Sequence, residues 1–275
     1  MGNKLIFILL DGLNYETAVS RMGFMQHLVE KEISRLYKIK AELPSLSRPL
    51  YETIFTGTPP YIHGVVSNLV VRRSKEKSVF ELAREQGLKT AAAAYYWMSE
   101  LYNHSPFHFV NDREQINEEQ NIQYGKYYFD DAYPDSHLFI DGEILRKTYD
   151  PDFLLIHPMG IDYIGHLYGS ESKEYKNKAM ETDLILAEFI PQWINQGYQI
   201  LVTADHGMNQ DGNHGGVEEN ERMVPLWTIG SCFQSEEELE TIPQTALAPM
   251  MCKILNMKIS EKMIDHDLQG WTFCE

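Results

Sequence analysis

Cysteine is scarce in this chain of 275 residues. The three cysteines, Cys232, Cys252 and Cys274, stand singly in the last part of the sequence. None forms the C-x-x-C spacing of a zinc knuckle or a redox pair, and three are too few for a disulfide scaffold. We therefore expect reduced cysteines with a structural role.

Long apolar runs are also absent. No stretch approaches the 18 or so apolar residues of a membrane span. The opening "MGNKLIFILLDG" has a single basic residue and a short apolar run that ends in an acid, which favours a buried strand over a signal peptide. These features predict a soluble protein, cytoplasmic by default, with no membrane partner.

Positive charge is the third shortage. Lys and Arg number 24 against 40 Asp and Glu, which gives a formal net charge of −16. Such a chain repels the phosphates of nucleic acids and anionic membranes at long range. We therefore expect no nucleic-acid polymer as a partner. A small anionic substrate would need a local source of positive field, and bound cations are the obvious one.

The sequence contains apolar runs of strand length that alternate with amphipathic segments. This order is typical of an α/β fold of three layers, with helices on both faces of a mostly parallel sheet. The pattern predicts strands at 4–10, 89–97, 152–157, 198–204 and 224–230, and helices at 78–87 and 172–197. We expect one catalytic domain over 1–275. Residues 101–137 lack a clear period, so we interpret them as a small inserted cap over the active face.

Acids and histidines follow three of the predicted strands. Asp11 follows the first, Asp162 and His166 follow the third, and Asp205 and His206 follow the fourth. Any one such Asp is usually a helix cap or a turn former. Ligands of parallel sheets, however, gather at the carboxyl ends of strands. Asp162 and His166 are also spaced i, i+4, which places both on one face of a helical turn.

The stretch "TADHGMNQDGNHGG" at 203–216 adds His214 among glycines. Asp and His without Cys suit divalent ions such as zinc or manganese. Two such ions can clamp the attacking and leaving oxygens of a displacement at phosphorus, and would need six or seven ligands. The residues at hand supply six: Asp11, Asp162, His166, Asp205, His206 and His214.

A serine before a short helix is the candidate nucleophile. Ser47, followed by Arg48 and Pro49, would place its hydroxyl at the positive end of that helix. The spacing alone leaves Ser45 as an equal alternative, and either serine could simply cap the helix.

The order of these motifs resembles a known family. "DG", "PSLSRP…TG…HGVVSN", "DYIGHLYG" and "ADHGM…GNHGG" are similar to the type I phosphodiesterase and nucleotide pyrophosphatase branch of the alkaline phosphatase superfamily, from Asp11 to about Pro225. Similar tails occur in ethanolamine-phosphate transferase domains and, more loosely, in cofactor-independent phosphoglycerate mutases and phosphopentomutases.

The resemblance implies an alkaline phosphatase-like fold and a role for each motif residue. Ser47 aligns with the nucleophile, and Asn68 with an asparagine that contacts a substrate phosphoryl oxygen. Asp211 has no counterpart and is interpreted as a turn acid. The implied metal sites are one ion on Asp11, Ser47, Asp205 and His206, and a second on Asp162, His166 and His214.

Two positions depart from the branch. His157 stands where many nucleotide pyrophosphatases have an aromatic residue, and Arg48 where an aromatic is common. The side chain of Arg48 would either favour a more anionic group or pair with a surface acid.

The predicted function is therefore that of a metal-dependent phosphoric ester hydrolase with two divalent ions, zinc or alternatively manganese. We expect it to cleave a phosphodiester or pyrophosphate of a small phosphorylated substrate through phosphoserine on Ser47. The alternatives are a phosphomonoesterase or phosphonate hydrolase, then a phosphotransferase or mutase, and last a non-catalytic metal-binding protein.

Overall fold

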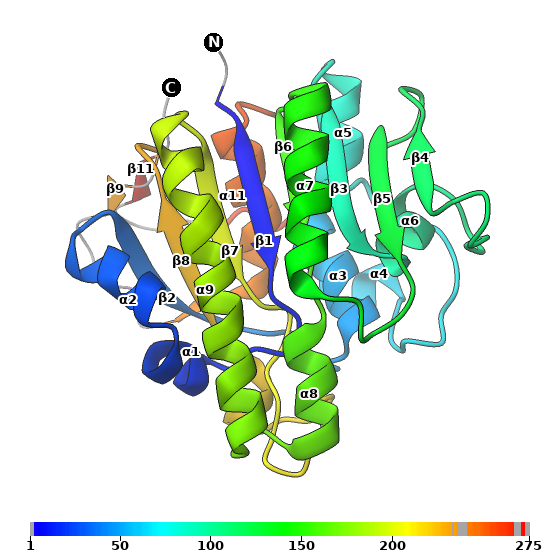
Figure 1. The fold of residues 1–275 in the computed structure, drawn as a ribbon. Helices are drawn as coiled ribbons and strands as arrows, with labels where there is room; N and C mark the ends of the chain where they lie inside the picture. The colour runs from blue at the N-terminus through cyan, green and yellow to red at the C-terminus, as the bar shows by residue number, and fades with distance from the viewer. Residues whose placement is uncertain (1–2, 233, 236–240, 267–270, 273–275) are drawn as a thin grey trace.

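A sheet of nine strands forms the centre of the molecule (Figure 1). The computed structural model describes residues 3–232, 234–235, 241–266 and 271–272. The strand order is β10-β2-β8-β7-β1-β6-β3-β5-β4. The strands are β1 (Leu5–Leu9), β2 (Ser34–Lys40), β3 (Thr90–Tyr95), β4 (Glu114–Ile116), β5 (Tyr124–Tyr128), β6 (Phe153–Ile156), β7 (Gln199–Thr203), β8 (Met223–Ile229) and β10 (Ile242–Pro243); β9 (Gln234–Ser235) pairs separately with β11 (Trp271–Thr272).

Most of the sheet is parallel. Only β8 and β4 run against their neighbours. The helices are α1 (Tyr15–Arg21), α2 (Gly23–Glu30), α3 (Ser47–Thr56), α4 (Pro60–His63), α5 (Val79–Glu85), α6 (Trp97–Tyr102), α7 (Asp135–Tyr149), α8 (Gly160–Tyr168), α9 (Lys173–Asn195), α10 (Glu219–Arg222) and α11 (Leu247–Ile254), with a 3₁₀ turn at Gln244–Ala246.

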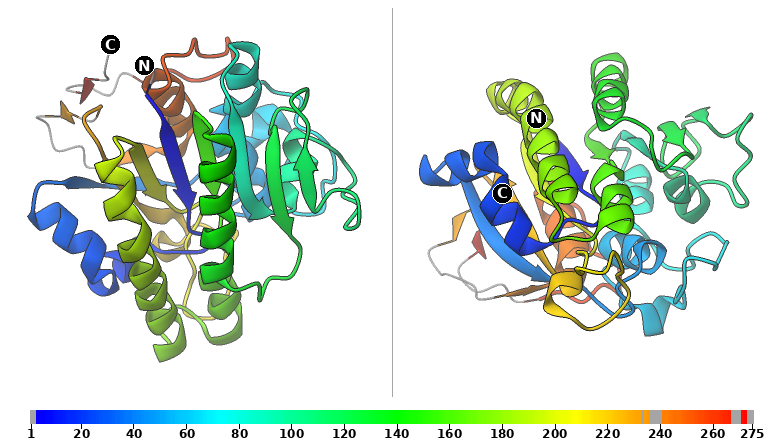
Figure 2. Two further views of the ribbon diagram at one scale, coloured as in Figure 1. Left: turned by 45° about the horizontal axis from the view of Figure 1, so that its top comes forward. Right: turned by 60° about the horizontal axis from the view of Figure 1, so that its bottom comes forward.

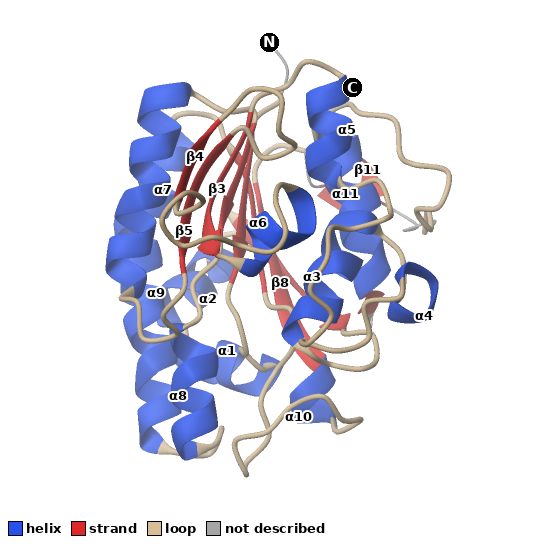
Figure 3. Ribbon diagram, turned by 90° about the vertical axis from the view of Figure 1, so that its right-hand side faces the viewer, coloured by secondary structure: helices blue, strands red, loops and turns tan. Residues whose placement is uncertain are grey.

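The helices form two layers around the sheet. Figure 3 shows α1, α2, α7 and α9 on one face and α3, α5, α6 and α11 on the other. This arrangement confirms the predicted three-layer α/β fold with a mostly parallel central sheet.

The apolar runs explain the central strands. Every residue of β1, β3, β6 and β7 is buried, as expected for parallel strands covered on both faces. The predicted helices are confirmed with their caps: the side chain of Ser78 accepts from the Glu81 N–H before α5, and that of Ser172 accepts from the Tyr175 N–H before α9.

The segment 101–137 differs from its prediction. It supplies β4 and β5 to the edge of the central sheet, where β5 pairs in parallel with β3. Residues 114–116 and 124–128 are therefore part of the central sheet, and the prediction of an inserted cap is wrong for these two strands. The strand β5 has the sequence "YGKYY", which lacks the aliphatic residues that identified the central strands.

Two further observations concern the opening expectations. Cys252 is a buried free thiol, but Cys232 is disulfide-bonded, so the expectation of a reduced thiol is wrong for Cys232; Cys274 lies outside the described residues. Within the part of the chain that the structure describes, no helix has the length and apolar character needed to span a bilayer.

Candidate metal centre and active site

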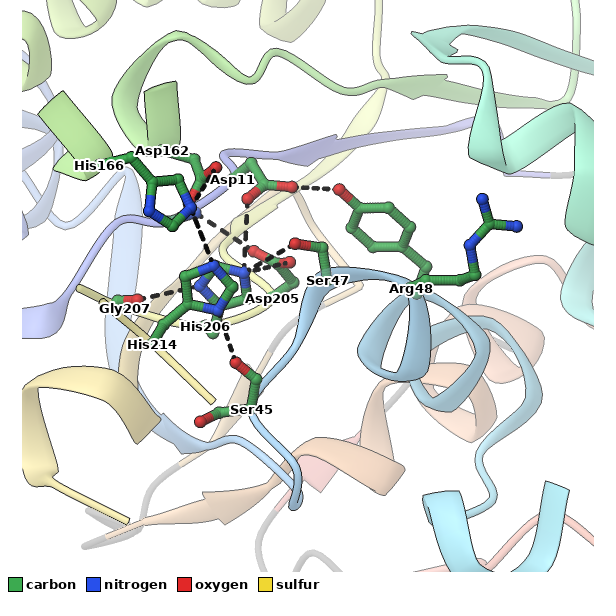
Figure 4. Close-up of polar contacts among 12 residues, drawn as sticks. Asp11, Ser45, Ser47, Arg48, Asp162, His166, Asp205, His206, Gly207 and His214 are labelled. Atoms are coloured by element: carbon green, nitrogen blue, oxygen red, sulfur yellow. Dashed lines mark hydrogen bonds and ion pairs between the residues drawn. The ribbon is translucent and has the colours of Figure 1, made fainter. Parts of the chain in front are cut away.

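Three carboxylates and three imidazoles meet at the carboxyl ends of the central strands (Figure 4). Asp11 follows β1, Asp205 and His206 follow β7, and Asp162 lies on α8, which follows β6. The right-hand view of Figure 2 shows the yellow segment after β7 between the green helix α8 and the blue helix α3. These loops meet because parallel strands 1, 6 and 7 are adjacent in the sheet.

Two donors from the core fix the orientation of Asp11. Its Oδ2 accepts from the Tyr51 hydroxyl and lies 3.1 Å from Nε2 of His157. The N–H of Tyr95 donates to Nδ1 of His157, so the proton of this imidazole sits on Nε2, facing Asp11. The other oxygen of Asp11, Oδ1, is left facing His206 at 3.5 Å.

Asp205 and His206 surround the same point. Oδ1 of Asp205 accepts from the Gly12 N–H at 3.3 Å, and its Oδ2 lies 3.2 Å from Nε2 of His206. Nδ1 of His206 donates to the Gly207 carbonyl at 2.9 Å, which leaves the lone pair of Nε2 directed at the two carboxylates.

His214 and His166 are oriented in the same way. Nδ1 of His214 donates to the Ser45 carbonyl and Nδ1 of His166 to the Gly212 carbonyl, each at 2.8 Å. Their Nε2 atoms therefore carry lone pairs, and these atoms lie 3.1 Å apart. Two lone pairs this close repel each other unless a cation lies between them or a proton is added. Asp162 is next to both, at 3.4 Å from His166 and 3.7 Å from His214.

The electrostatics of this cluster fit bound cations. Three buried carboxylate oxygens have no hydrogen-bond partner: Asp11 Oδ1, Asp162 Oδ1 and Asp205 Oδ2. Burial, and then the charge of Asp11, raise the pKa values of Asp162 and Asp205 well above the usual range. Burial also raises that of Asp11, but the His157 hydrogen bond and the charges of His206 and His157 outweigh it and lower the pKa to about 2. Divalent ions would remove the cost of this buried negative charge.

The donor atoms form two groups of metal-ligand size. One is Asp11, Asp205 and His206, which are three of the four ligands that the resemblance implied for the first ion, Ser47 being the fourth. The other is Asp162, His206 and His214, so His206 lies within reach of both groups. His166 stands at the rim, with 45% of its side chain exposed.

Ser47 and Ser45 have different surroundings. Ser47 begins α3, and its Oγ lies 3.0 Å from Nε2 of His206. Ser45 instead donates to the Gly216 carbonyl and accepts from the Gly215 N–H, so its hydroxyl holds the turn that carries His214. The structure therefore places Ser47, and not Ser45, in the cluster.

The two other expected site residues lie beside Ser47. Oδ1 of Asn68 accepts from the N–H of Arg48 at 3.0 Å, at the N-terminus of α3. The guanidinium of Arg48 points away from the metal ligands (Figure 4). It pairs with Glu100 at 2.7 Å and lies 4.4 Å above the ring of Trp97. Arg48 thus pairs with an acid, as one of its two interpretations held, but that acid is buried.

Sequence reasoning missed the residues that support the ligands. His157 was noted only as a departure, although it directly follows a predicted strand, like Asp11 and Asp205. Tyr51 and Glu100 gave no signal, because their roles depend on partners 40 and 52 positions away.

Comparisons with known proteins identify relatives of this chain. The human "GPI ethanolamine phosphate transferase 2, catalytic subunit" is 24% identical over 95% of this chain and 27% of its own length. The mouse "GPI ethanolamine phosphate transferase 3, catalytic subunit" is 23% identical over 94% of this chain and 24% of its own length. The chain thus spans about a quarter of the length of these curated relatives.

A solved structure shares the fold. Murine ectonucleotide pyrophosphatase/phosphodiesterase 5 superposes with a TM-score of 0.75 at 12% identity, over 94% of this chain and 96% of the other. The family model of type I phosphodiesterase / nucleotide pyrophosphatase matches residues 5–225, which include every candidate ligand and Ser47. The chain therefore belongs to the type I phosphodiesterase / nucleotide pyrophosphatase family.

Proposed function

We propose that this chain is a two-metal phosphoesterase that hydrolyses a phosphodiester or pyrophosphate of a small organic substrate. One observation carries the proposal. The Ser47 hydroxyl stands at the N-terminus of α3, 3.0 Å from His206, in a cluster with three unpartnered carboxylate oxygens. A candidate nucleophile and candidate metal ligands are thus in one place.

The residues divide between two ions. Asp11, Asp205, His206 and Ser47 would hold one, and Asp162, His166 and His214 the other. Bound divalent ions lower the pKa of a hydroxyl and stabilise negative charge on phosphoryl oxygens. Oxygen and imidazole donors accept zinc and manganese alike, and we propose zinc with manganese as the alternative.

The chain's own groups suit attack by Ser47. The Ser47 hydroxyl would lose its proton to solvent, and its Oγ would form a bond to phosphorus while the bond to the leaving oxygen breaks. The leaving group, an alcohol from a diester or a phosphate from a pyrophosphate, would take a proton from solvent. Water would then cleave the phosphoserine and return the serine. Oδ1 of Asn68 accepts from the Arg48 N–H beside Ser47, so the amide nitrogen of Asn68 would be the group that donates to a phosphoryl oxygen.

His206 does not suit the role of general base. Burial, and then His214, lower its pKa to about 3, so it accepts a proton poorly near neutrality. This property agrees with a metal ligand and distinguishes the site from a serine–histidine dyad.

A second candidate function is transfer of an alkylphosphoryl group, such as ethanolamine phosphate, to an acceptor hydroxyl. It is favoured by the curated relatives, which match nearly the whole chain. A groove of about 430 Å³ beside α8 would suit an ammonium group, because Asp131, Glu174 and Glu181 line it together with Tyr133 and Tyr163. Its one cation, Lys178, is already paired with Asp135 at 2.8 Å.

The test compares substrates after chelation and return of zinc or manganese. Bis-p-nitrophenyl phosphate, p-nitrophenyl phosphate and p-nitrophenyl phosphoethanolamine are each supplied with and without glycerol as acceptor. Hydrolysis of the diesters supports the proposal, and a glycerol phosphodiester product supports transfer. Turnover of the monoester alone would contradict the proposal and indicate a phosphomonoesterase. No turnover of any substrate with metal bound would indicate a non-catalytic metal-binding protein.

Replacement of the nucleophile gives the sharpest prediction. We expect Ser47→Ala to lower kcat by roughly 10³-fold or more, because the hydroxyl beside His206 is lost, while the Tyr51 hydroxyl is held by Asp11. Elemental analysis should still find metal, since all six candidate carboxylate and imidazole ligands persist. Ser45→Ala is the matched control for a neighbouring serine; wild-type turnover in the Ser47 variant would contradict the assignment.

A further inference from the structure

A cluster of exposed apolar side chains lies on α4 and the loop that follows it. Its members are Tyr61, Ile62, Val66, Leu69 and Val71, with exposed fractions of 79%, 51%, 52%, 89% and 51%. We refer to these five residues as the 61–71 patch. Single exposed apolar residues are ordinary on protein surfaces, but five within eleven positions mark an interaction surface.

The segment that carries the patch is held in a defined conformation. The Arg72 guanidinium donates to the His63 carbonyl at 2.6 Å, which joins the two ends of the loop. A turn from Ser67 to Val70 closes its tip. Figure 3 shows α4 at the edge of the molecule, outside α3 and α11, which agrees with the exposure of the side chains it carries.

The charge next to the patch is opposite to that of the chain as a whole. Residues 67–77 include Arg72, Arg73, Lys75 and Lys77 against the single acid Glu76, although acids outnumber bases by 40 to 24 overall. Arg72 lies 3.9 Å from Glu52, and Lys77 pairs with Glu85 at 2.7 Å. Arg73 donates to the Tyr102 carbonyl, and this bond does not neutralise its charge.

We propose that the 61–71 patch docks on an anionic lipid surface. Exposed aliphatic and aromatic side chains beside Lys and Arg are the composition that enters the interface of a bilayer. The five apolar side chains would lie among the acyl chains near the headgroups, while Arg73 and Lys75 meet lipid phosphates.

The net charge of −16 led the sequence to predict no membrane partner, but that prediction treats the charge as uniform. At physiological ionic strength charges are screened over about 8 Å, so the groups at the contact decide the sign of the interaction. In the segment 67–77, beside the patch, four charged residues are cationic and one is acidic.

Docking there would also place the reactive site at the level of the headgroups. Asn68 lies in the same loop, between Val66 and Leu69, and accepts from the N–H of Arg48 beside Ser47. This inference concerns where the chain binds and does not depend on whether the reaction is hydrolysis or transfer.

The test is sedimentation of the full chain with vesicles. We expect binding to phosphatidylcholine vesicles that contain about one third phosphatidylserine, weaker binding to pure phosphatidylcholine, and loss of the difference at high salt. Val66→Ser with Leu69→Ser should weaken binding by about tenfold or more, because two apolar anchors are removed. Arg73→Gln with Lys75→Gln should weaken only the binding to anionic vesicles.

A matched control uses exposed apolar residues elsewhere. Ile140 on α7 and Leu184 on α9 are 50% and 67% exposed, and Ile140→Ser with Leu184→Ser should bind vesicles like the wild type. All variants should turn over a soluble diester at the wild-type rate, and this measurement shows that each variant is folded. Failure of the wild type to bind anionic vesicles would overturn the proposal, as would equal binding by the patch variant. Light scattering would detect a different outcome. If the wild type has a higher molecular mass than the variant with Val66→Ser and Leu69→Ser, the patch is an interface between copies of this chain and the proposal is overturned.

Discussion

The position of single atoms in Asp11 shows how the core prepares the candidate site. Tyr51 and His157 both donate to Oδ2, which leaves only Oδ1 to face the other ligands. A carboxylate held in this way loses little freedom when an ion binds. Such supporting donors contribute to metal affinity although they do not touch the ion.

His157→Phe should therefore weaken metal binding by about 10–100-fold, because it removes one of the two donors while filling similar volume. Calorimetric titration of the chelated protein with zinc measures this directly. His104→Phe is the control, since His104 also bonds a carboxylate, Asp112, at 2.8 Å, but outside the cluster. Equal zinc affinity in the His157 variant and the wild type would contradict the positioning role.

At the scale of elements, the backbone of α8 lies very close to the backbone of the turn after β1. Gly12 has a φ of +73°, and a Cβ there would lie 2.7 Å from Cα of Asp162. Backbone cannot move away as a flexible side chain can. The turn thus needs glycine for its conformation and for the space it leaves to the second metal group.

Gly12→Ala should lower the free energy of unfolding and displace Asp162, with a loss of metal at its site. Gly87→Ala is the matched control, because Gly87 has a similar φ of +75° but no atom within 4 Å of an added Cβ. We expect about 1 kcal/mol of destabilisation for the control and clearly more for Gly12→Ala. Urea denaturation and elemental analysis measure the two effects, and equal losses in the two variants would refute the steric argument.

The helix α3, which presents Ser47, also carries a buried acid. Burial raises the pKa of Glu52 to about 7, against the hydrogen bond from Ser74. In the unfolded chain this carboxyl ionises near 4.5, so between about pH 4.5 and 7 the folded state binds more protons. Its contribution to stability is therefore present at low pH and lost as the pH rises through 7.

Glu52→Gln should remove this loss of unfolding free energy, which is on the order of 3 kcal/mol between about pH 4.5 and 7. The neighbouring His63, whose pKa burial lowers to about 4, titrates with the opposite sign, so the wild type alone would show a flattened profile. The difference in unfolding free energy between variant and wild type isolates Glu52, and a difference that does not change with pH would contradict its raised pKa.

At the scale of the whole molecule, a chain of net charge −16 buries three carboxyl groups with unpartnered oxygens, and ionising Asp162 and Asp205 there costs stability. Ions that bind only the folded state would add stability in proportion to their concentration above Kd. The cluster thus couples folding to metal supply.

The effect of Asp205→Asn on Tm should therefore change sign when metal is added. Without metal we expect a higher Tm than the wild type, because one buried charge is gone; each kcal/mol corresponds to roughly 2–4 °C. With zinc added we expect a lower Tm, because a ligand is lost. Thermal unfolding with chelator and with zinc compares the two proteins, and a variant that is less stable in both conditions would refute the electrostatic cost.

How much could be predicted differs from element to element. The buried strands β1, β3, β6 and β7 were evident from continuous apolar runs. The strands β2, with the sequence "SRLYKIK", and β5 were missed because polar and aromatic residues interrupt them. The disulfide at Cys232 was missed because spacing along the chain does not report proximity. The cytoplasmic location stays a prediction, and a disulfide does not favour a reducing compartment.

The sequence by itself determined the fold class and indicated the candidate ligands, because strand ends and groups of Asp and His are local patterns of residue type. Only the tertiary structure decided between Ser47 and Ser45, turned Arg48 away to Glu100, and set Tyr51 and His157 behind Asp11. The physical reason is that hydrogen bonds and buried charges select partners by distance in space. Residues far apart in the chain reach that distance only when the layers pack.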